Sequence, residues 1–203
     1  MSLSERYSLT LLSLSGDTGE AAEVPPHVFD RIETVRLPRW QSRLNCLLAL
    51  PTRIPLQLAY FWNNEFADKV AELAPEHDAI LCHLVRSAEY ALPYDIPKVL
   101  EMTDAISLNY KRVRETGSPT RLRKLIYSLE QSRLEAYERQ IVDQFDTAVL
   151  VSHADRSFLF GDDPDRLGKV IVCSNGVDTS RLPYQFAEHP EDRIAFVGNM
   201  TTL

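Results

Sequence analysis

Strand-like apolar runs alternate with segments of helical periodicity along almost the whole chain, and this alternation restricts the fold more than any other feature of the sequence. The predicted strands are residues 7–15, 32–37, 78–85, 98–102, 147–151, 169–173 and 194–197. The predicted helices are residues 40–49, 64–74, 86–91, 119–144 and 153–160. Repeated β-then-α units form parallel sheets whose crossovers are right-handed. The expected fold class is therefore α/β with a doubly wound, Rossmann-like parallel sheet.

Two of these segments carry a further expectation. The run 78–85 is apolar on both faces, which is typical of a central parallel strand covered by helices. In the helix predicted at 40–49, the large apolar side chains of Trp40, Leu44, Leu47 and Leu48 share one face.

Composition and charge exclude several classes of protein. The net charge of −7 and the pI near 5.3 argue against a dedicated nucleic-acid binder, which is usually basic. The cysteines Cys46, Cys82 and Cys173 form no C-x-x-C pair and fit no disulfide framework, so a reducing compartment is expected. No apolar run reaches the ~18–20 residues that cross a bilayer, and residues 1–7 resemble no secretory signal. We therefore expect a cytoplasmic protein, with the inner face of the membrane as an alternative location.

Ligands of doubly wound sheets bind outside the carboxyl ends of the strands. These ends are predicted at residues 15–16, 83–86, 102–104, 152–153 and 175–178, and they supply the candidate site residues. A metal site is not expected, because the five histidines lack metal-binding spacing and Asp163-Pro164-Asp165 is interpreted as a solvated turn.

Three stretches carry a family resemblance: FDTAVLVSHADRSFL at 145–159, KVIVCSNGVDTSRLPY at 169–184 and RIAFVGNM at 193–200. This series resembles the middle of retaining glycosyltransferases with the two-Rossmann-domain GT-B fold, in the large family that includes sucrose synthases and many bacterial polysaccharide transferases. The upstream stretches RIPLQLAYFWNNEF, DAILCHLVRSAEY and KVLEMTDAISLNYKRV look like bacterial exopolysaccharide sugar transferases. The resemblance covers residues 7–200.

The resemblance implies a domain organisation and an activity. Residues 4–190 are expected to form the amino-terminal, acceptor-side domain, without the family's first strand before residue 7. Residues 191–203 are expected to be a linker and the start of the donor-binding domain. The implied function is a hexosyltransferase that moves a sugar from a nucleotide-sugar to a polysaccharide or lipid-linked acceptor with retention of configuration. No cofactor or metal is implied, and this chain alone is expected to transfer no sugar.

His83, Glu101 and Asp104 are the candidate catalytic residues. A histidine at a strand end can orient the donor sugar or the acceptor, and a carboxylate can bind sugar hydroxyls or assist proton removal. Alternatively, His83 binds a backbone carbonyl and Asp104 caps a helix. Arg86 can bind a phosphate or carboxylate through its guanidinium, or be a solvated surface charge.

The remaining candidates are substrate-binding. Ser152 and His153 resemble the serine-led loop that the family places near the cleft, and a helix cap is the alternative for Ser152. By resemblance, the loop Asn175, Gly176, Val177 and Asp178 lines the cleft; its Asn-Gly pair suits a tight left-handed bend, and a plain turn is the alternative. Gly198 would let the backbone approach a phosphate.

Partners beyond the substrates are also expected. The basic stretch Lys111–Lys124, next to an apolar stripe, is a candidate for peripheral contact with an anionic membrane, against the alternative of an exposed basic helix face. A dimer or a strand exchange is expected at the place of the missing strand. The competing functions are a GT-B nucleotide-sugar epimerase and a non-catalytic α/β ligand-binding module; G-x-G-x-x-G, which a dinucleotide-binding module needs, does not occur.

Overall fold

The structure is a computed structural model that describes residues 3–16, 27–116 and 121–180. The strands are β1 (Thr10–Ser15), β2 (Arg31–Arg36), β3 (Ile80–His83), β4 (Lys98–Thr103), β5 (Thr147–Leu150) and β6 (Val170–Val172). The α-helices are α1 (Arg39–Ala49), α2 (Leu56–Phe61), α3 (Asn64–Leu73), α4 (Ile106–Thr116), α5 (Arg121–Ile141), α6 (His153–Phe160) and α7 (Pro164–Leu167). Short 3₁₀ helices are η1 (Leu3–Glu5), η2 (Ala74–Glu76), η3 (Val85–Tyr90) and η4 (Val142–Gln144). The strand predicted at 194–197 lies outside the described residues.

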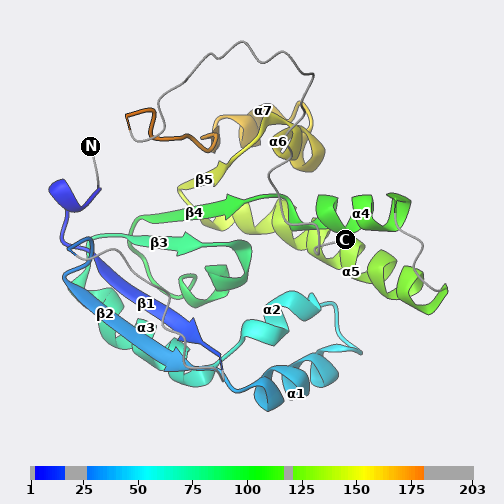
Figure 1. The fold of residues 1–203 in the computed structure, drawn as a ribbon, viewed down its shortest axis with the longest axis horizontal. Helices are drawn as coiled ribbons and strands as arrows, with labels where there is room; N and C mark the ends of the chain where they lie inside the picture. Colours follow the sequence, from blue (N-terminus) through cyan, green and yellow to red (C-terminus); the bar gives the residue numbers. More distant parts are fainter. Residues whose placement is uncertain (1–2, 17–26, 117–120, 181–203) are drawn as a thin grey trace, which may run out of the picture.

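The strands form two parallel sheets, which confirms the predicted α/β class and is consistent with a Rossmann-like doubly wound fold. β1 pairs with β2, and the second sheet has the order β3-β4-β5-β6. In Figure 1 the arrows of β1 and β3 point toward the same side of the molecule, so the carboxyl ends of both sheets lie on that side. Residues that follow these strands are therefore placed where α/β proteins bind ligands.

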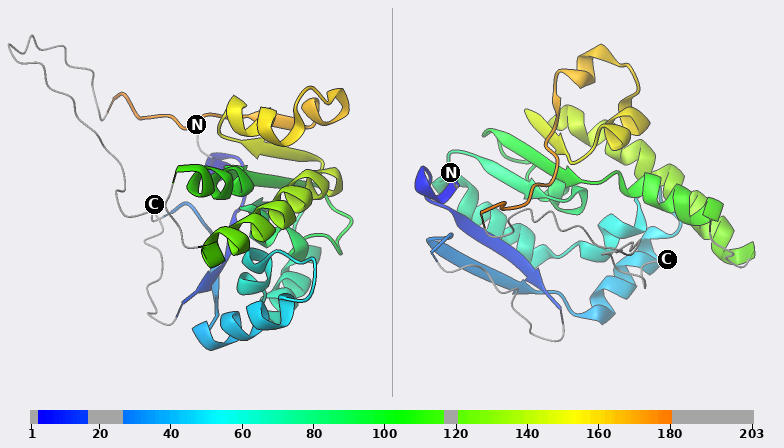
Figure 2. Two further views of the ribbon diagram at one scale, coloured as in Figure 1. Left: turned by 90° about the vertical axis from the view of Figure 1, so that its right-hand side faces the viewer. Right: turned by 45° about the horizontal axis from the view of Figure 1, so that its top comes forward.

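The main core lies between the four-stranded sheet and the helices on one of its faces. Leu100 and Met102 of β4 and Ala148 and Leu150 of β5 are fully buried there against residues of η3, α5 and α6. A smaller cluster packs β1 and β2 on α3 through Val35, Phe66 and Tyr90. Helices α4 and α5 lie side by side beside the larger sheet (Figures 1 and 2).

The prediction that residues 78–85 form a central, covered strand is wrong for the described part of the chain. β3 is an edge strand of its sheet, and β1 belongs to the other sheet. On the face opposite the core, Leu81 of β3 is 61% exposed and Ile171 of β6 is 53% exposed. The run correctly predicted that β3 has apolar residues on both faces. An apolar run does not indicate how many strands lie beside it.

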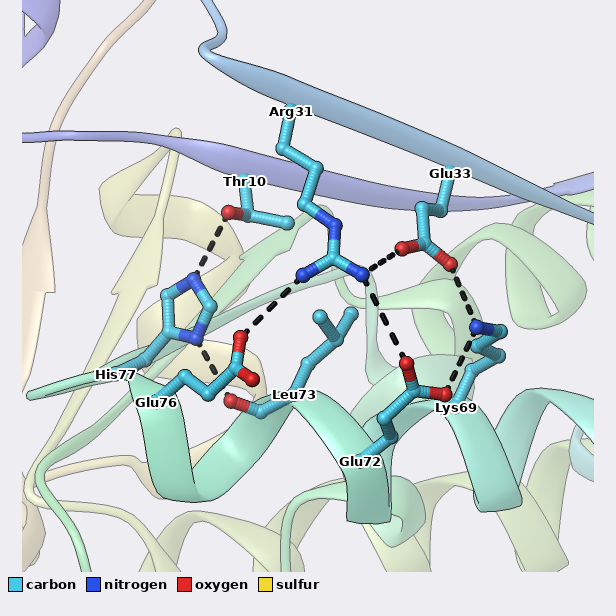
Figure 3. Close-up of polar contacts among 8 residues, drawn as sticks. All are labelled: Thr10, Arg31, Glu33, Lys69, Glu72, Leu73, Glu76 and His77. Atoms are coloured by element: carbon cyan, nitrogen blue, oxygen red, sulfur yellow. Dashed lines mark hydrogen bonds and ion pairs between the residues drawn. The ribbon is translucent and has the colours of Figure 1, made fainter.

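A polar network fastens β1 and β2 to the end of α3 (Figure 3). Arg31 of β2 forms ion pairs with Glu33, Glu72 and Glu76, and Lys69 pairs with Glu33 and Glu72 at 3.1 and 2.8 Å. His77 bridges the two elements, with Nδ1 2.8 Å from the Leu73 carbonyl and Nε2 2.9 Å from Thr10 Oγ1. This network lies at the amino ends of β1 and β2, opposite the expected ligand side.

Candidate functional site

The carboxyl ends of β3 and β4 bring together two of the three predicted catalytic residues. His83 and Glu101 face each other in the parallel register of these strands, and His83 Nδ1 is hydrogen-bonded to Glu101 Oε2. The other carboxylate oxygen accepts a 2.7 Å hydrogen bond from Thr103 Oγ1. Because a carboxylate only accepts, Nδ1 carries the proton, and the exposed Nε2 has no partner among the described residues. The alternative of a histidine bound to a backbone carbonyl is not what the structure shows.

The backbone at this edge is strained on both strands. Leu84 has φ 66° and ψ 146°, close to a region that is essentially restricted to glycine. Thr103 has φ 60°, which is a clear outlier for a β-branched residue. The Asp104 N–H donates to the Met102 carbonyl at 2.8 Å across Thr103, and the register of β4 against β5 shifts between Glu101 and Thr103. Strain and bulges of this kind cluster at functional sites, and here they flank the His83–Glu101 pair.

Asp104, the third predicted catalytic residue, lies at the same edge, but its side chain does not cap a helix in the described part of the chain. Its side chain makes no hydrogen bond or ion pair with any described residue, so the capping alternative is wrong. The N-terminus of α4 receives two other carboxylates instead. Glu138 accepts from Ile106 N–H at 2.7 Å, and Asp155 accepts from Ala105 N–H at 3.3 Å.

Arg86 lies in η3, three residues after His83. Its guanidinium carbon is 4.2 Å from the centre of the Phe61 ring, a cation–π contact. Burial lowers the pKa of Arg86, and no carboxylate among the described residues pairs with it. A half-buried guanidinium stacked on an aromatic ring and without an acidic partner is suited to an anion such as phosphate.

Ser152 caps helix α6, which was the predicted alternative to substrate binding. Its Oγ accepts a 3.1 Å hydrogen bond from Asp155 N–H and also contacts the Asp155 carboxylate. His153 is exposed at the start of α6, with Nδ1 3.4 Å from the Arg156 guanidinium. Substrate binding by Ser152 and His153 stays a prediction.

The left-handed bend predicted at Asn175-Gly176 is wrong. Neither residue has positive φ, and the chain after β6 continues without regular structure. Open space surrounds the position of a Cβ at Gly176, so no close contact requires a glycine there. Val177 is exposed, and Asp178 accepts hydrogen bonds from Ser180 N–H and Oγ. Gly198 lies outside the described residues.

A pocket that the sequence analysis missed opens at the carboxyl end of β2. It has a volume of about 480 Å³ and is lined by Arg36, Pro38, Trp40, Gln41, Asn63, Asn64 and Glu65. The strand 32–37 was predicted, and applying the carboxyl-end rule to it would have found Arg36 and Pro38.

The wall of this pocket is held by two aromatic residues. Tyr90 Oη accepts from Asn63 N–H at 2.7 Å and donates to the Phe61 carbonyl at 2.8 Å, and burial raises the pKa of Tyr90 to about 12. Trp62 stacks on Tyr90 and donates its Nε1–H to Asn64 Oδ1 at 3.0 Å. This bond fixes the Asn64 amide and leaves its NH₂ group available at the pocket.

The described residues contain no group of three or more His, Cys, Asp or Glu side chains that could hold a metal ion. Within the same residues, none of the helices combines the length and apolar character that crossing a membrane requires. The cysteines Cys46, Cys82 and Cys173 are free.

A scan against protein-family models and a search among curated proteins both return no match to this chain.

Proposed function

We propose that this chain is the acceptor-side domain of a retaining glycosyltransferase with the GT-B fold, which transfers a sugar from a nucleotide-sugar to a polysaccharide or lipid-linked acceptor. The observation that carries the proposal is the His83–Glu101 pair, exposed on a strained edge at the carboxyl ends of β3 and β4. A parallel α/β fold binds ligands at this edge, and the resemblance of residues 145–200 to such transferases indicates which chemistry is used there.

The pair suits contact with a sugar. Glu101 fixes the imidazole so that Nε2 of His83 points to solvent, where it accepts a hydrogen bond or a proton from a hydroxyl when the ring is neutral. The Asp104 carboxylate at the same edge, which has no partner in the described part of the chain, adds a second acceptor for hydroxyl groups. Arg86, stacked on Phe61, supplies positive charge for a phosphate oxygen.

The remainder of the chemistry belongs to a donor-binding domain that would close over this edge and exclude water. In this proposal the chain by itself binds acceptor without turning it over, needs no metal, and works at the cytoplasmic face of the membrane.

The test is a transfer assay on a protein that contains this chain together with a donor-binding domain, with a panel of nucleotide-sugars and lipid-linked or oligosaccharide acceptors. His83→Ala is expected to lower kcat/KM about 10²-fold or more, the range of a lost acid–base or positioning group. Asp68→Asn, an exposed change on α3, is the matched control and is expected to retain full activity.

Two results would count against the proposal. Turnover by wild type that His83→Ala leaves unchanged would remove His83 from the reaction. Absence of turnover with every donor, in a wild-type protein that still binds a glycan, would favour a non-catalytic binding module.

A further inference from the structure

Helix α1 has the opposite orientation to an ordinary surface helix, whose apolar face is turned to the core. Its large apolar side chains face solvent: Trp40 is 67% exposed, Leu47 62% and Leu48 65%, and Leu44 is exposed beside them. These residues follow an i, i+4, i+7, i+8 spacing, which places them on one stripe. Leu50 and Ile54, just after the helix, are also exposed and extend the apolar surface.

The opposite face of α1 carries small and polar residues, and this face contacts the protein. Ser42 and Ala49 are buried. Asn45 donates its side-chain N–H to the Trp62 carbonyl at 2.8 Å, and Cys46 Sγ lies 3.6 Å from the Leu56 carbonyl. The orientation is therefore fixed by specific contacts with the region of α2, and the apolar stripe cannot rotate inward without breaking them.

The segment of sequence that contains this stripe is basic, whereas the whole chain is acidic. Residues 34–64 contain four arginines, Arg36, Arg39, Arg43 and Arg53, and no aspartate or glutamate, in a protein whose net charge is −7. Arg43 and Arg53 are exposed and form no ion pair with any described residue. In Figure 1 and in the left view of Figure 2, α1 lies at the margin of the molecule, where a flat surface can reach it.

We propose that the α1 face, defined as Trp40, Leu44, Leu47, Leu48, Leu50 and Ile54 with Arg43 and Arg53 beside them, docks on an anionic lipid bilayer. An interfacial helix of this kind buries its apolar face at the boundary of headgroups and acyl chains, while arginines contact anionic headgroups. Tryptophan is favoured at this boundary because its ring is apolar and its N–H is polar.

The positive charge of the α1 face favours an anionic bilayer over a second copy of the chain as its partner. Two copies joined through this face by a two-fold axis would bring Arg43 and Arg53 of both copies into one interface, and like charges repel. An anionic membrane offers the complementary charge over the same area. The basic stretch Lys111–Lys124 is the weaker candidate in its described part, because Lys111 lies over the Phe158 ring and Arg114 donates to Ser128 Oγ.

Docking of the α1 face on a bilayer does not depend on the proposed function, because it requires no sugar transfer. It has a consequence for that function: Trp40 belongs both to the α1 face and to the pocket at the carboxyl end of β2, so a bilayer-held acceptor would be presented beside that pocket.

The test is vesicle flotation with the full chain, on phosphatidylcholine vesicles and on vesicles with about 30 mol% phosphatidylglycerol. Wild type is expected to float with the anionic vesicles, and less so at high salt. Leu47→Gln/Leu48→Gln is expected to weaken binding at least about tenfold, and Arg43→Gln about fivefold. Leu129→Gln, which changes a leucine of α5 that is 53% exposed, and Lys111→Gln are the controls and are expected to bind as wild type.

Because Leu47 and Leu48 are exposed, their replacement leaves the fold intact, and a thermal melt checks this. The proposal would be overturned if wild type did not bind anionic vesicles. It would also be overturned if the double variant bound them as tightly as wild type. A wild-type dimer in light scattering that the double variant converts to a monomer would overturn it as well, because the α1 face would then be a contact between two copies.

Discussion

Glu138 makes the stability of this protein depend on pH in an unusual direction. The side chain is fully buried on α5 and accepts hydrogen bonds from Ile106 N–H at 2.7 Å, from Ser107 N–H and from Ser107 Oγ. Burial raises its pKa from 4.5 to about 7, against the opposing effect of these donors, and the nearby Glu135 charge adds to the increase. The folded protein therefore holds a proton that the unfolded chain releases at lower pH.

The sign and size of the effect follow from proton linkage. Below pH 4.5 both states are protonated, and Glu138 contributes its full stability. Between pH 4.5 and about 7 the unfolded chain loses the proton first, so stability falls by about 1.4 kcal/mol for each pH unit. Over this window the loss amounts to about 3 kcal/mol, and above it the contribution is constant.

Glu138→Gln removes the titration while keeping the shape and one oxygen acceptor for the backbone of α4. We expect the free energy of unfolding of this variant not to decrease between pH 4.5 and about 7. At pH 8 it should exceed that of wild type by up to about 3 kcal/mol, and at pH 5 the two should differ little. Urea unfolding at several pH values measures it, with Asp68→Asn as the matched exposed control. Parallel pH profiles for wild type and Glu138→Gln would show that Glu138 does not cause the pH dependence of stability.

Three further outcomes are expected. At Thr103, whose φ is positive, the glycine variant should be about 1 kcal/mol more stable than the alanine variant in urea unfolding, and the reverse order would show that the backbone is unstrained. Cys173 is exposed and should react at once with a thiol reagent at pH 8, whereas buried Cys82, with its pKa raised to about 11 chiefly by burial, should react only after unfolding; equal rates would contradict this. Tyr90→Phe leaves the Asn63 N–H without its acceptor and should cost about 1–3 kcal/mol in thermal or urea unfolding, while an unchanged stability would mean that this hydrogen bond contributes nothing.

The order of strands and helices was predictable because each element carries its own periodicity. The prediction at 153–160 matches α6, and those at 40–49 and 64–74 match α1 and α3 to within a residue. The start of α4 near Asp104 was predicted, but its cap was wrongly assigned to Asp104, because the first N–H groups are satisfied by Glu138 and Asp155, which come from 32 and 50 residues further along the chain. A cap supplied from such a distance leaves no local signal.

The site was predictable only in outline. Side chains near the carboxyl ends of neighbouring parallel strands lie at one edge of the sheet, so His83 and Glu101 could be placed at the same edge from sequence, whereas their contact depends on the register. The positive φ of Leu84 and Thr103 could not be predicted, because leucine and threonine normally avoid positive φ. The α1 face was visible as an apolar stripe, but whether such a stripe faces the core or solvent depends on packing, and here the buried positions hold Ser42 and Ala49.

A structure of this chain with a bound acceptor glycan or nucleotide-sugar would locate the ligand site directly. We expect the ligand at the carboxyl ends of β3 and β4, with a hydroxyl within hydrogen-bond distance of His83 Nε2. A ligand held at the opposite ends of the strands, in the pocket lined by residues 95–98 and 143–146, would contradict it.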